Sequence, residues 1–318
     1  MPPVPALCPA DIGRRVTLRA LRHDGAFDTV GELVSVDQHR VSVRRRDGEV
    51  VDLGWPPEPE TGLPPVVVGR VVPPDIGAFA LQEIAQAGWP PRETQTLGEW
   101  TMRWHGGVSG RANSVRVAGS PGQPLSQAVE RVTEWYISHD GTPLLQVPRP
   151  FLAAELSAEN WHVTRTVLAL SIATRALETD IGPEQIRVLH SATPDEGWFG
   201  MLDEDADAKR QDLLAILTGP RDVTFATAVD SAGTVVGIGR GSLNSGWCGI
   251  TSIVTSPQHR RQGIASVLTR SLGAWALGNG ATMAYLQVLD TNVAARSLYE
   301  QLGFSVHHWY DYWEPDST

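Results

Sequence analysis

The sequence predicts an α/β protein in which one strand–helix–strand unit occurs twice, behind a small all-β module. Short alternating segments occupy residues 11–54, residues 55–75 are rich in proline, and strands alternate with helices thereafter. Leu145-Gln146-Val147 and Leu286-Gln287-Val288 each follow a predicted helix that carries a tryptophan, which indicates a duplication. With 42% hydrophobic and 19% charged residues, the chain can bury cores of this kind.

The first 54 residues predict a small β-barrel of the SH3-like kind. Apolar residues alternate with polar ones at Val16, Leu18 and Ala20. The pair Asp47-Gly48 lies between two such segments and predicts a hairpin with a type I′ turn, because both central residues of that turn have positive φ. The proline-rich residues 55–75 are expected to form a linker, since proline stiffens a chain and interrupts strand pairing.

The rest of the chain is expected to divide at about residue 180 into two related units, 76–180 and 181–318. The elements predicted for the first unit are a helix over 79–87, strands over 100–104 and 113–117, a helix over 125–137 and strands over 144–147 and 163–172. Those predicted for the second unit are strands over 250–254 and 284–288, helices over 263–277 and 293–302, and a final strand after Phe304.

Composition excludes several classes of protein. The net charge of −10 argues against a general nucleic-acid binder. Two cysteines, Cys8 and Cys248, are too few for a disulfide framework or a structural zinc site, and no metal is expected. No apolar stretch reaches the ~20 residues of a membrane span, and the first ten residues lack the features of a signal peptide. We therefore expect a cytoplasmic protein without a membrane partner; its oligomeric state stays open.

The most informative segment follows the strand over 250–254. There Arg260-Arg-Gln-Gly263-Ile-Ala265 opens a helix, and small residues let the backbone approach a bulky anion. The helix start adds unpaired N–H groups and a partial positive charge. This pattern predicts a cradle for a diphosphate, as nucleotide-bearing cofactors require. An ordinary strand-to-helix turn is the structural alternative.

With Asn292 and Leu298-Tyr-Glu-Gln-Leu-Gly-Phe304 in the expected order, residues 249–310 resemble the GNAT superfamily of N-acetyltransferases. The whole chain also resembles a bacterial group with an SH3-like module ahead of two GNAT-like units, through Gly88-Trp-Pro, Arg111-Ala-Asn-Ser-Val115 and Pro124-Leu. Mycothiol synthase is another two-unit relative, but it lacks the leading module.

The resemblance implies a mixed-sheet GNAT fold, acetyl-CoA as co-substrate and a set of site residues. The edge of the fourth family strand would hold the pantetheine arm through Ile253, Val254 and Thr255, and the Val254 N–H would face the thioester carbonyl. The CoA pyrophosphate would be bound beside Arg260 by the backbone N–H groups of Arg261, Gln262, Gly263, Ile264 and Ala265.

Two further residues match family positions. Asn292 matches a residue that contacts CoA, and it can serve as a helix N-cap as well. Tyr299 matches the tyrosine that protonates the leaving thiolate, a proton transfer that is reasonable between a phenol of pKa about 10 and a thiol of pKa about 8.5. The alternative role for Tyr299 is packing in the core.

The general base departs from the family pattern, because no glutamate lies on the strand over 250–254. His307, His308 and Asp311 remain open as bases that could reach the amine directly or through water. Cys248 is expected to be a buried small side chain, since direct attack by an amine needs no enzyme nucleophile. The unit over 76–180 lacks the cradle, so we expect it to bind no acetyl-CoA and to form one wall of the acceptor site.

These observations favour an enzyme that transfers an acetyl group to a primary amine of a small molecule or a protein. The negative net charge mildly favours a cationic acceptor. Two alternatives stay open: a non-catalytic regulator that binds acyl-CoA, and an amine acyltransferase similar to mycothiol synthase. Turnover of acetyl-CoA distinguishes the regulator from both enzymes.

Overall fold

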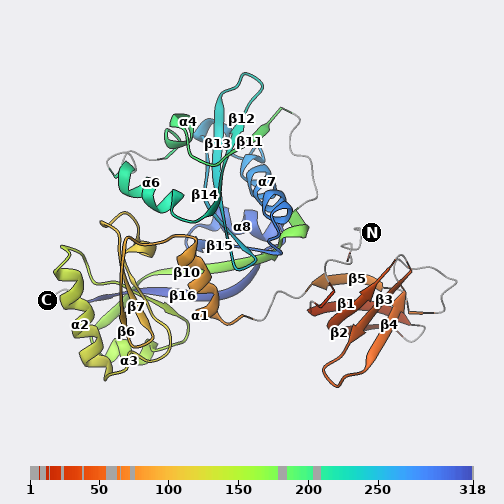
Figure 1. Cartoon of the computed structure of the whole chain (residues 1–318), viewed down its shortest axis with the longest axis horizontal. Coiled ribbons are helices and arrows are strands. Elements are labelled where there is room, and N and C mark those ends of the chain that lie inside the picture. The colour runs from red at the N-terminus through yellow and green to blue at the C-terminus, as the bar shows by residue number, and fades with distance from the viewer. Residues whose placement is uncertain are drawn as a thin grey trace. The chain divides into compact units, whose positions relative to one another are not determined.

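A computed structural model describes residues 7, 12–13, 15–22, 25–37, 39–54, 63–64, 66–71, 76–177, 185–202 and 209–316. The contacts within the chain divide it into two compact units, Met1–Asp75 and Ile76–Thr318 (Figure 1). In the described part of the chain, no helix is long and apolar enough to cross a membrane.

The small unit contains one five-stranded antiparallel sheet with the order β4-β3-β2-β1-β5. Its strands are β1 (Arg15–Arg22), β2 (Gly25–Val36), β3 (Arg40–Arg44), β4 (Val50–Gly54) and β5 (Val66–Val71). The last strand corrects the expected linker over 55–75: Val66–Val71 contains no proline and pairs with β1. The SH3-like barrel remains a prediction.

The turn between β3 and β4 forms the expected hairpin with a different geometry. The Gly48 N–H donates to the Arg45 carbonyl at 3.0 Å, and the Arg45 N–H donates to the Glu49 carbonyl at 2.7 Å. Of the turn residues, Gly48 alone has a positive φ, 89°. This is a type I turn followed by a left-handed glycine instead of a type I′ turn, because the loop is longer than two residues.

The large unit alternates strands and helices. Its first half contains α1 (Ala78–Ala87), β6 (Glu93–Leu97), β7 (Trp100–Trp104), β8 (Val115–Arg116), α2 (Leu125–Ile137), β9 (Leu145–Pro148), α3 (Ala153–Ala158) and β10 (Trp161–Ala173). Its second half contains β11 (Arg187–Ser191), α4 (Glu196–Phe199), α6 (Arg210–Thr218), β12 (Asp222–Val229), β13 (Val235–Asn244), β14 (Trp247–Thr255), α7 (Ile264–Gly278), β15 (Met283–Leu289), α8 (Val293–Gln301) and β16 (Ser305–Pro315).

The eleven strands described in the large unit join one sheet, in the order β11-β12-β13-β14-β15-β10-β16-β9-β8-β7-β6. In each half a parallel pair is followed by a final strand, but the two final strands exchange places: β10 pairs with β15, and β16 pairs with β9. This corrects the expected boundary near residue 180. Each half contains one parallel strand pair, and the exchange of the final strands joins both halves in one compact unit.

Helix α7 packs closely on the second half of the sheet, because glycines of β13 leave room for it. A Cβ atom added at Gly237 would lie 2.7 Å from Ile264 Cγ2, and one at Gly241 would lie 3.1 Å from Trp275. Ile264, Leu268 and the other inward residues of α7 are buried in this core. The close contact fixes the N-terminus of α7 at the end of β14, where the predicted cradle lies.

Candidate active site

The strands β14 and β15 separate part-way along their length. Their parallel pairing covers Trp247 to Gly249 on β14 and stops there. On its other edge β14 continues to pair with β13 as far as Thr255. One edge of β14 beyond Gly249 is therefore open, and its backbone groups face a gap that an extended, amide-containing ligand could enter like an added strand.

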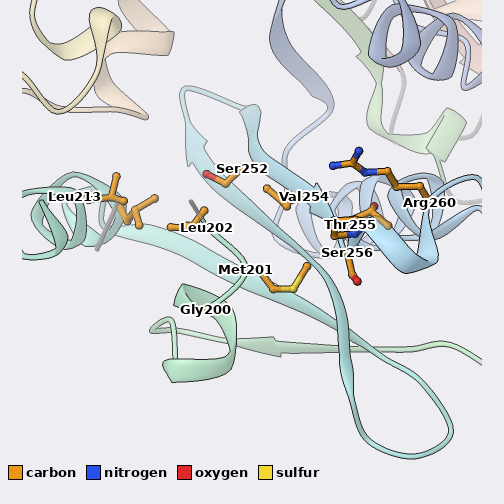
Figure 2. Close-up of a pocket in the computed structure, with 11 residues that line it drawn as sticks. Gly200, Met201, Leu202, Leu213, Ser252, Val254, Thr255, Ser256 and Arg260 are labelled. Atoms are coloured by element: carbon orange, nitrogen blue, oxygen red, sulfur yellow. The ribbon is translucent and has the colours of Figure 1, made fainter. Parts of the chain in front are cut away.

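A cavity of about 530 Å³ lies beside this open strand (Figure 2). One wall comes from the segment after α4 and from α6, the other from β14 and the turn that follows it. Its lining residues are Gly200, Met201, Leu202, Leu213, Leu217, Ser252, Val254, Thr255, Ser256, Pro257 and Arg260. Three of the predicted site residues, Val254, Thr255 and Arg260, therefore lie together at the cavity.

The predicted cradle has the backbone geometry of an anion site. Gly263 adopts the left-handed conformation with φ of 81° directly before α7, and no side chain caps this helix start. Arg261 also has a positive φ, 61°. Because the first N–H groups of a helix have no partner within it, the amides from Arg261 to Ala265 are available to a diphosphate. Arg260, Arg261 and Gln262 are exposed, whereas the Ile264 side chain is buried.

The ladder between β13 and β14 changes the expected role of Val254. Val254 is paired with Ile238, and two residues later the Ser256 N–H donates to the Val236 carbonyl at 2.9 Å. Since hydrogen-bonded pairs alternate along an antiparallel ladder, the Val254 N–H is directed towards β13, away from the gap. The expectation that this amide faces the thioester is therefore wrong.

A bulge interrupts the same ladder just before Val254. Two residues, Ser252 and Ile253, stand opposite Gly239 alone, and Ser252 has a positive φ of 55°. The Ile253 side chain points to the α7 side of the sheet, where its Cδ1 lies 2.7 Å from a Cβ added at Gly239. Such a bulge redirects backbone groups locally, which is why bulges often occur beside active sites.

Tyr299 lies on α8 in the same hydrophobic core as the buried residues of α7. Its side chain is 7% exposed and its ring meets Phe304 edge-on, with 5.6 Å between the centroids. Burial raises the pKa of Tyr299 to about 12, so the phenol is protonated at neutral pH. The structure does not bring Tyr299 to the lining of the 530 Å³ cavity.

Asn292 is the N-cap of α8. Its side-chain oxygen accepts a hydrogen bond from the Ala295 N–H at 3.1 Å. Cys248 is fully buried in the core, and burial raises the pKa of its thiol to about 12. The neutral thiol agrees with the structural role expected for Cys248 and makes it a poor nucleophile.

None of the three candidate bases presents a free basic atom. His308 lies within hydrogen-bond distance of two groups, Gln82 Nε2 at 2.7 Å and His307 Nδ1 at 2.8 Å. Burial and the neighbouring His307 lower the pKa of His308 to about 4. Asp311 receives two hydrogen bonds from Arg149, at 2.5 and 2.8 Å, and one from Thr166 at 2.7 Å.

Gln82 of α1 joins the two halves of the sheet at this place. Its Oε1 accepts hydrogen bonds from the Nε2 groups of Gln146 on β9, at 2.6 Å, and Gln287 on β15, at 3.3 Å. Gln82 Nε2 must then donate to His308, which makes His308 Nε2 the acceptor and places the ring proton on Nδ1. The two glutamines are the central residues of the repeated Leu-Gln-Val triplets.

The two triplet glutamines differ at their side-chain oxygens. Gln146 Oε1 accepts a hydrogen bond from Arg103 at 2.5 Å. Gln287 Oε1 is buried and has no hydrogen-bond partner among the described residues. Gln287 also lines a second cavity of about 230 Å³, between β15, β10, β16 and the loop over 109–111. Within the described residues, no group of three or more potential metal ligands occurs at this or any other place.

Sequence reasoning missed this second cavity and three residues around it, Trp89, Arg111 and Gln287. Signals for them were present: Trp89 and Arg111 lie in the segments that resemble the two-unit bacterial group, and Gln287 is in the repeated triplet. Their convergence depends on the exchange of β10 and β16, which no local pattern in the sequence reveals.

Comparison with known proteins identifies the family. Residues 78–313 match the family model described as "Probable histone acetyltransferase Rv0428c C-terminal", which is well over half of the chain. The chain belongs to this family. It is an N-acetyltransferase of the GNAT type, and so an acyltransferase. The SH3-like module and the two-unit bacterial architecture suggested by the sequence stay predictions.

Relatives and solved structures agree with the assignment. An N-acetyltransferase of Bacillus subtilis, YobR, is 26% identical over 244 residues, covering 72% of this chain and 96% of the relative. The GCN5-related N-acetyltransferase from Kribbella flavida has the same fold, with a TM-score of 0.59 and 16% identity over 76% of this chain and 97% of that one. A tandem GNAT protein from the clavulanic acid biosynthesis pathway gives a TM-score of 0.52 and 17% identity, covering 64% of this chain and 76% of that one.

Proposed function

We propose that the acetyltransferase transfers the acetyl group of acetyl-CoA to a primary amine by direct attack, at the gap between β14 and β15. The observation that carries the proposal is the position of the uncapped α7 start at the end of the open strand. A diphosphate bound at Arg261–Ala265 would lie where its attached chain could run along β14 into the gap.

The chain's own groups supply the binding. The amides of Arg261, Gln262, Gly263, Ile264 and Ala265 would hold the pyrophosphate, with Arg260 beside them. The Thr255 N–H, which alternates with the paired Val254, faces the gap and would bind the pantetheine arm. We assign the contact to the thioester carbonyl to the bulge at Ser252–Ile253 in place of Val254, because the bulge re-aims the amides next to the last β15 pair.

The reaction balances without a covalent enzyme intermediate. The neutral amine attacks the carbonyl carbon, the N–C bond forms, the C–S bond breaks and CoA leaves as a thiolate. The thiolate takes a proton from a nearby acid, for which we propose Tyr299, and the acylated nitrogen loses its extra proton to water. The Tyr299 phenolate then regains a proton from solvent, which restores the enzyme. Water is the natural acceptor because His307, His308 and Asp311 are already engaged with neighbouring groups.

The high pKa of Tyr299 has a consequence for this role. A phenol of pKa about 12 gives a proton to a thiolate only if the thiolate is also made more basic by apolar surroundings. The Tyr299 hydroxyl makes no hydrogen bond with other described residues, so its proton is not held by a neighbouring group. Asn292 would remain the cap of α8 and contact CoA only through its free amide nitrogen.

The test is release of CoA from acetyl-CoA with a panel of amines, comparing wild type with Tyr299→Phe. We expect kcat to fall about 100-fold in the variant while KM for acetyl-CoA changes less than threefold, because the phenol acts after binding. A kcat close to that of wild type would remove Tyr299 from the mechanism. Tight acetyl-CoA binding without turnover on any amine would instead indicate an acyl-CoA-binding regulator.

A further inference from the structure

The 230 Å³ cavity contains two arginines but little negative charge. Arg111 makes no hydrogen bond or ion pair with other described residues; its guanidinium lies over the Trp89 ring, 5.3 Å from the centroid. Arg165 lies over Tyr312 at 4.8 Å, and its one carboxylate partner within the described residues, Glu314, is 3.9 Å away. The interior of the cavity therefore has the opposite charge to the chain as a whole.

A third arginine increases the positive potential behind the same tryptophan. Arg240 is fully buried, lies 5.4 Å from the Trp89 centroid and donates only to neutral groups: the Leu217 and Gly88 carbonyls and the Thr251 hydroxyl. Burial, with a contribution from Arg111, lowers the pKa of Arg240 to about 10, so it stays charged at neutral pH. Such uncompensated charge near a cavity favours an anionic ligand.

The loop that carries Arg111 is held in place by hydrogen bonds. Trp89 Nε1 donates to the Ser109 hydroxyl at 2.9 Å. The Asn113 side chain donates to the Ser109 carbonyl at 2.8 Å and accepts from the His105 and Gly107 N–H groups at 2.7 and 3.0 Å. Arg111 is therefore presented by a braced turn, which reduces the entropy lost when it binds a ligand.

Gln287, which also lines the cavity, has a side-chain oxygen that can accept a hydrogen bond. Gln287 Nε2 is turned to Gln82, which leaves the buried Gln287 Oε1 without a partner. Gln287 follows Tyr285, the last β15 residue paired with β14, by two positions, so it stands at the gap where the thioester is proposed to lie. An unpaired buried oxygen is satisfied by a donor such as an amine N–H.

We infer that this cavity is the acceptor site and that it selects a small amine that also carries a carboxylate, such as an amino acid. Arg111, supported by Arg165, binds the carboxylate, while Gln287 Oε1 accepts a hydrogen bond from the amine and holds it at the gap. The 230 Å³ volume accommodates a molecule of that size. This reverses the preference for a cationic acceptor that the net charge suggested, because net charge describes the whole surface and not one cavity.

The inference rests on the proposed function for its kinetic test, but the binding site can be tested separately. The kinetic test compares amino acids with their decarboxylated counterparts, for example L-phenylalanine with 2-phenylethylamine and L-leucine with 3-methylbutylamine, at saturating acetyl-CoA. An amidated lysine-containing peptide represents a protein amine. We expect kcat/KM to be about 10- to 100-fold higher for the carboxylated member of a pair, the usual range for a hydrogen bond to a charged group.

Arg111→Gln should abolish that preference through the KM of the carboxylated acceptor, with the KM of acetyl-CoA unchanged. Arg111→Lys keeps the charge without the planar fork and should retain part of the preference. Arg131→Gln, on the exposed face of α2, is the matched control and should behave as wild type. Equal or better use of the decarboxylated amines or the peptide by wild type would overturn the inference, as would an unchanged preference in Arg111→Gln.

Calorimetric titration of the same amino acids, without acetyl-CoA, separates this inference from the proposed function. Binding that is lost in Arg111→Gln but kept in Arg131→Gln supports the carboxylate site even if no acetyl transfer is detected. Acetyl transfer to amines together with no carboxylate-dependent binding would contradict the site and leave the proposed function standing.

Discussion

In the first half of the large sheet, β8 and β9 are still paired at Gln146, whereas β14 and β15 have separated before they reach Gln287. Gln146 is paired with Arg116, and its carbonyl accepts a hydrogen bond from the Val117 N–H at 3.1 Å. The buried Arg103 donates a hydrogen bond to the side-chain oxygen of Gln146. The equivalent oxygen of Gln287 is unpaired. The parallel pair is thus closed by neighbouring residues in the first half and separated at the corresponding glutamine in the second half.

The loop that follows β14 and the loop that follows β8 also differ. After β14, Arg260 and Gly263 lead into α7 with an uncapped first turn. After β8 the chain runs through Ala118-Gly-Ser-Pro-Gly-Gln-Pro124 into α2, whose first turn also lacks a side-chain cap but follows a proline. Both halves contain a parallel strand pair, but only the loop after β14 has the residues that we propose bind a diphosphate, because function depends on the residues at the site.

The largest expected effect is the loss of acetyl-CoA binding when a negative charge is placed in the loop after β14 but not in the loop after β8. Gly263→Asp should weaken acetyl-CoA binding at least 1000-fold, measured by calorimetry, because a carboxylate would stand at the diphosphate site. Gly263→Asn has nearly the same shape and tolerates the left-handed conformation, so it isolates the charge. Gly122→Asp, in the loop after β8, should leave the affinity unchanged. Equal losses for Gly122→Asp and Gly263→Asp would refute the difference between the two loops.

The next effect is on stability, and it compares Arg103, which binds Gln146 in the first half, with Gln287 in the second half. Arg103→Ala should lower the free energy of unfolding by about 3 kcal/mol or more, because it leaves Gln146 Oε1 and the Ser114 carbonyl without their donor. Gln287→Ala should cost only about 1 kcal/mol, since its oxygen has no partner and its one hydrogen bond is 3.3 Å long. Urea unfolding measures both, and similar losses would contradict the contrast.

A smaller effect on stability depends on pH, through His308, which contacts Gln82 between the two halves of the sheet. The pKa of His308 is lowered to about 4 in the folded protein, against about 6.5 for an unperturbed histidine. The unfolded chain therefore binds more protons between these values, so this contribution to stability is complete above pH 6.5 and is lost as the pH falls towards 4. His308→Gln, which keeps an acceptor for Gln82 Nε2, should flatten the fall in urea midpoint over that range; an unchanged pH profile would contradict the assignment.

The smallest effect concerns the helices that follow the two parallel strand pairs. Asn292 caps α8, whereas Leu152 at the start of α3 has no capping side chain. Asn292→Ala should reduce the free energy of unfolding by about 1 kcal/mol, and Asn292→Asp should restore most of it. Leu152→Ala gives the comparison without a cap. A loss of CoA affinity in Asn292→Asp, which keeps the cap, would show that the amide nitrogen also binds the cofactor.

The sequence alone determined the elements with strong periodicity and the turn that precedes α7. Several elements lie within two residues of their predicted bounds: helices α1, α2, α7 and α8 and strands β7, β9 and β15. Their bounds were predictable because the spacing of apolar residues along a short segment indicates a helix or a strand directly. The turn from Arg260 to Ala265 was predictable for the same reason: its conformation depends on Gly263 and on the helix that follows.

Only the tertiary structure decided what those elements do together. The exchange of β10 and β16, the end of the β14–β15 pairing at Gly249 and the direction of the Val254 N–H all depend on partners far away in the sequence. The second cavity depends on them too, since Arg111 and Gln287 meet only when both halves share one sheet. Local spacing carries no information about such contacts, because strand order and pairing register are set by packing over the whole sheet.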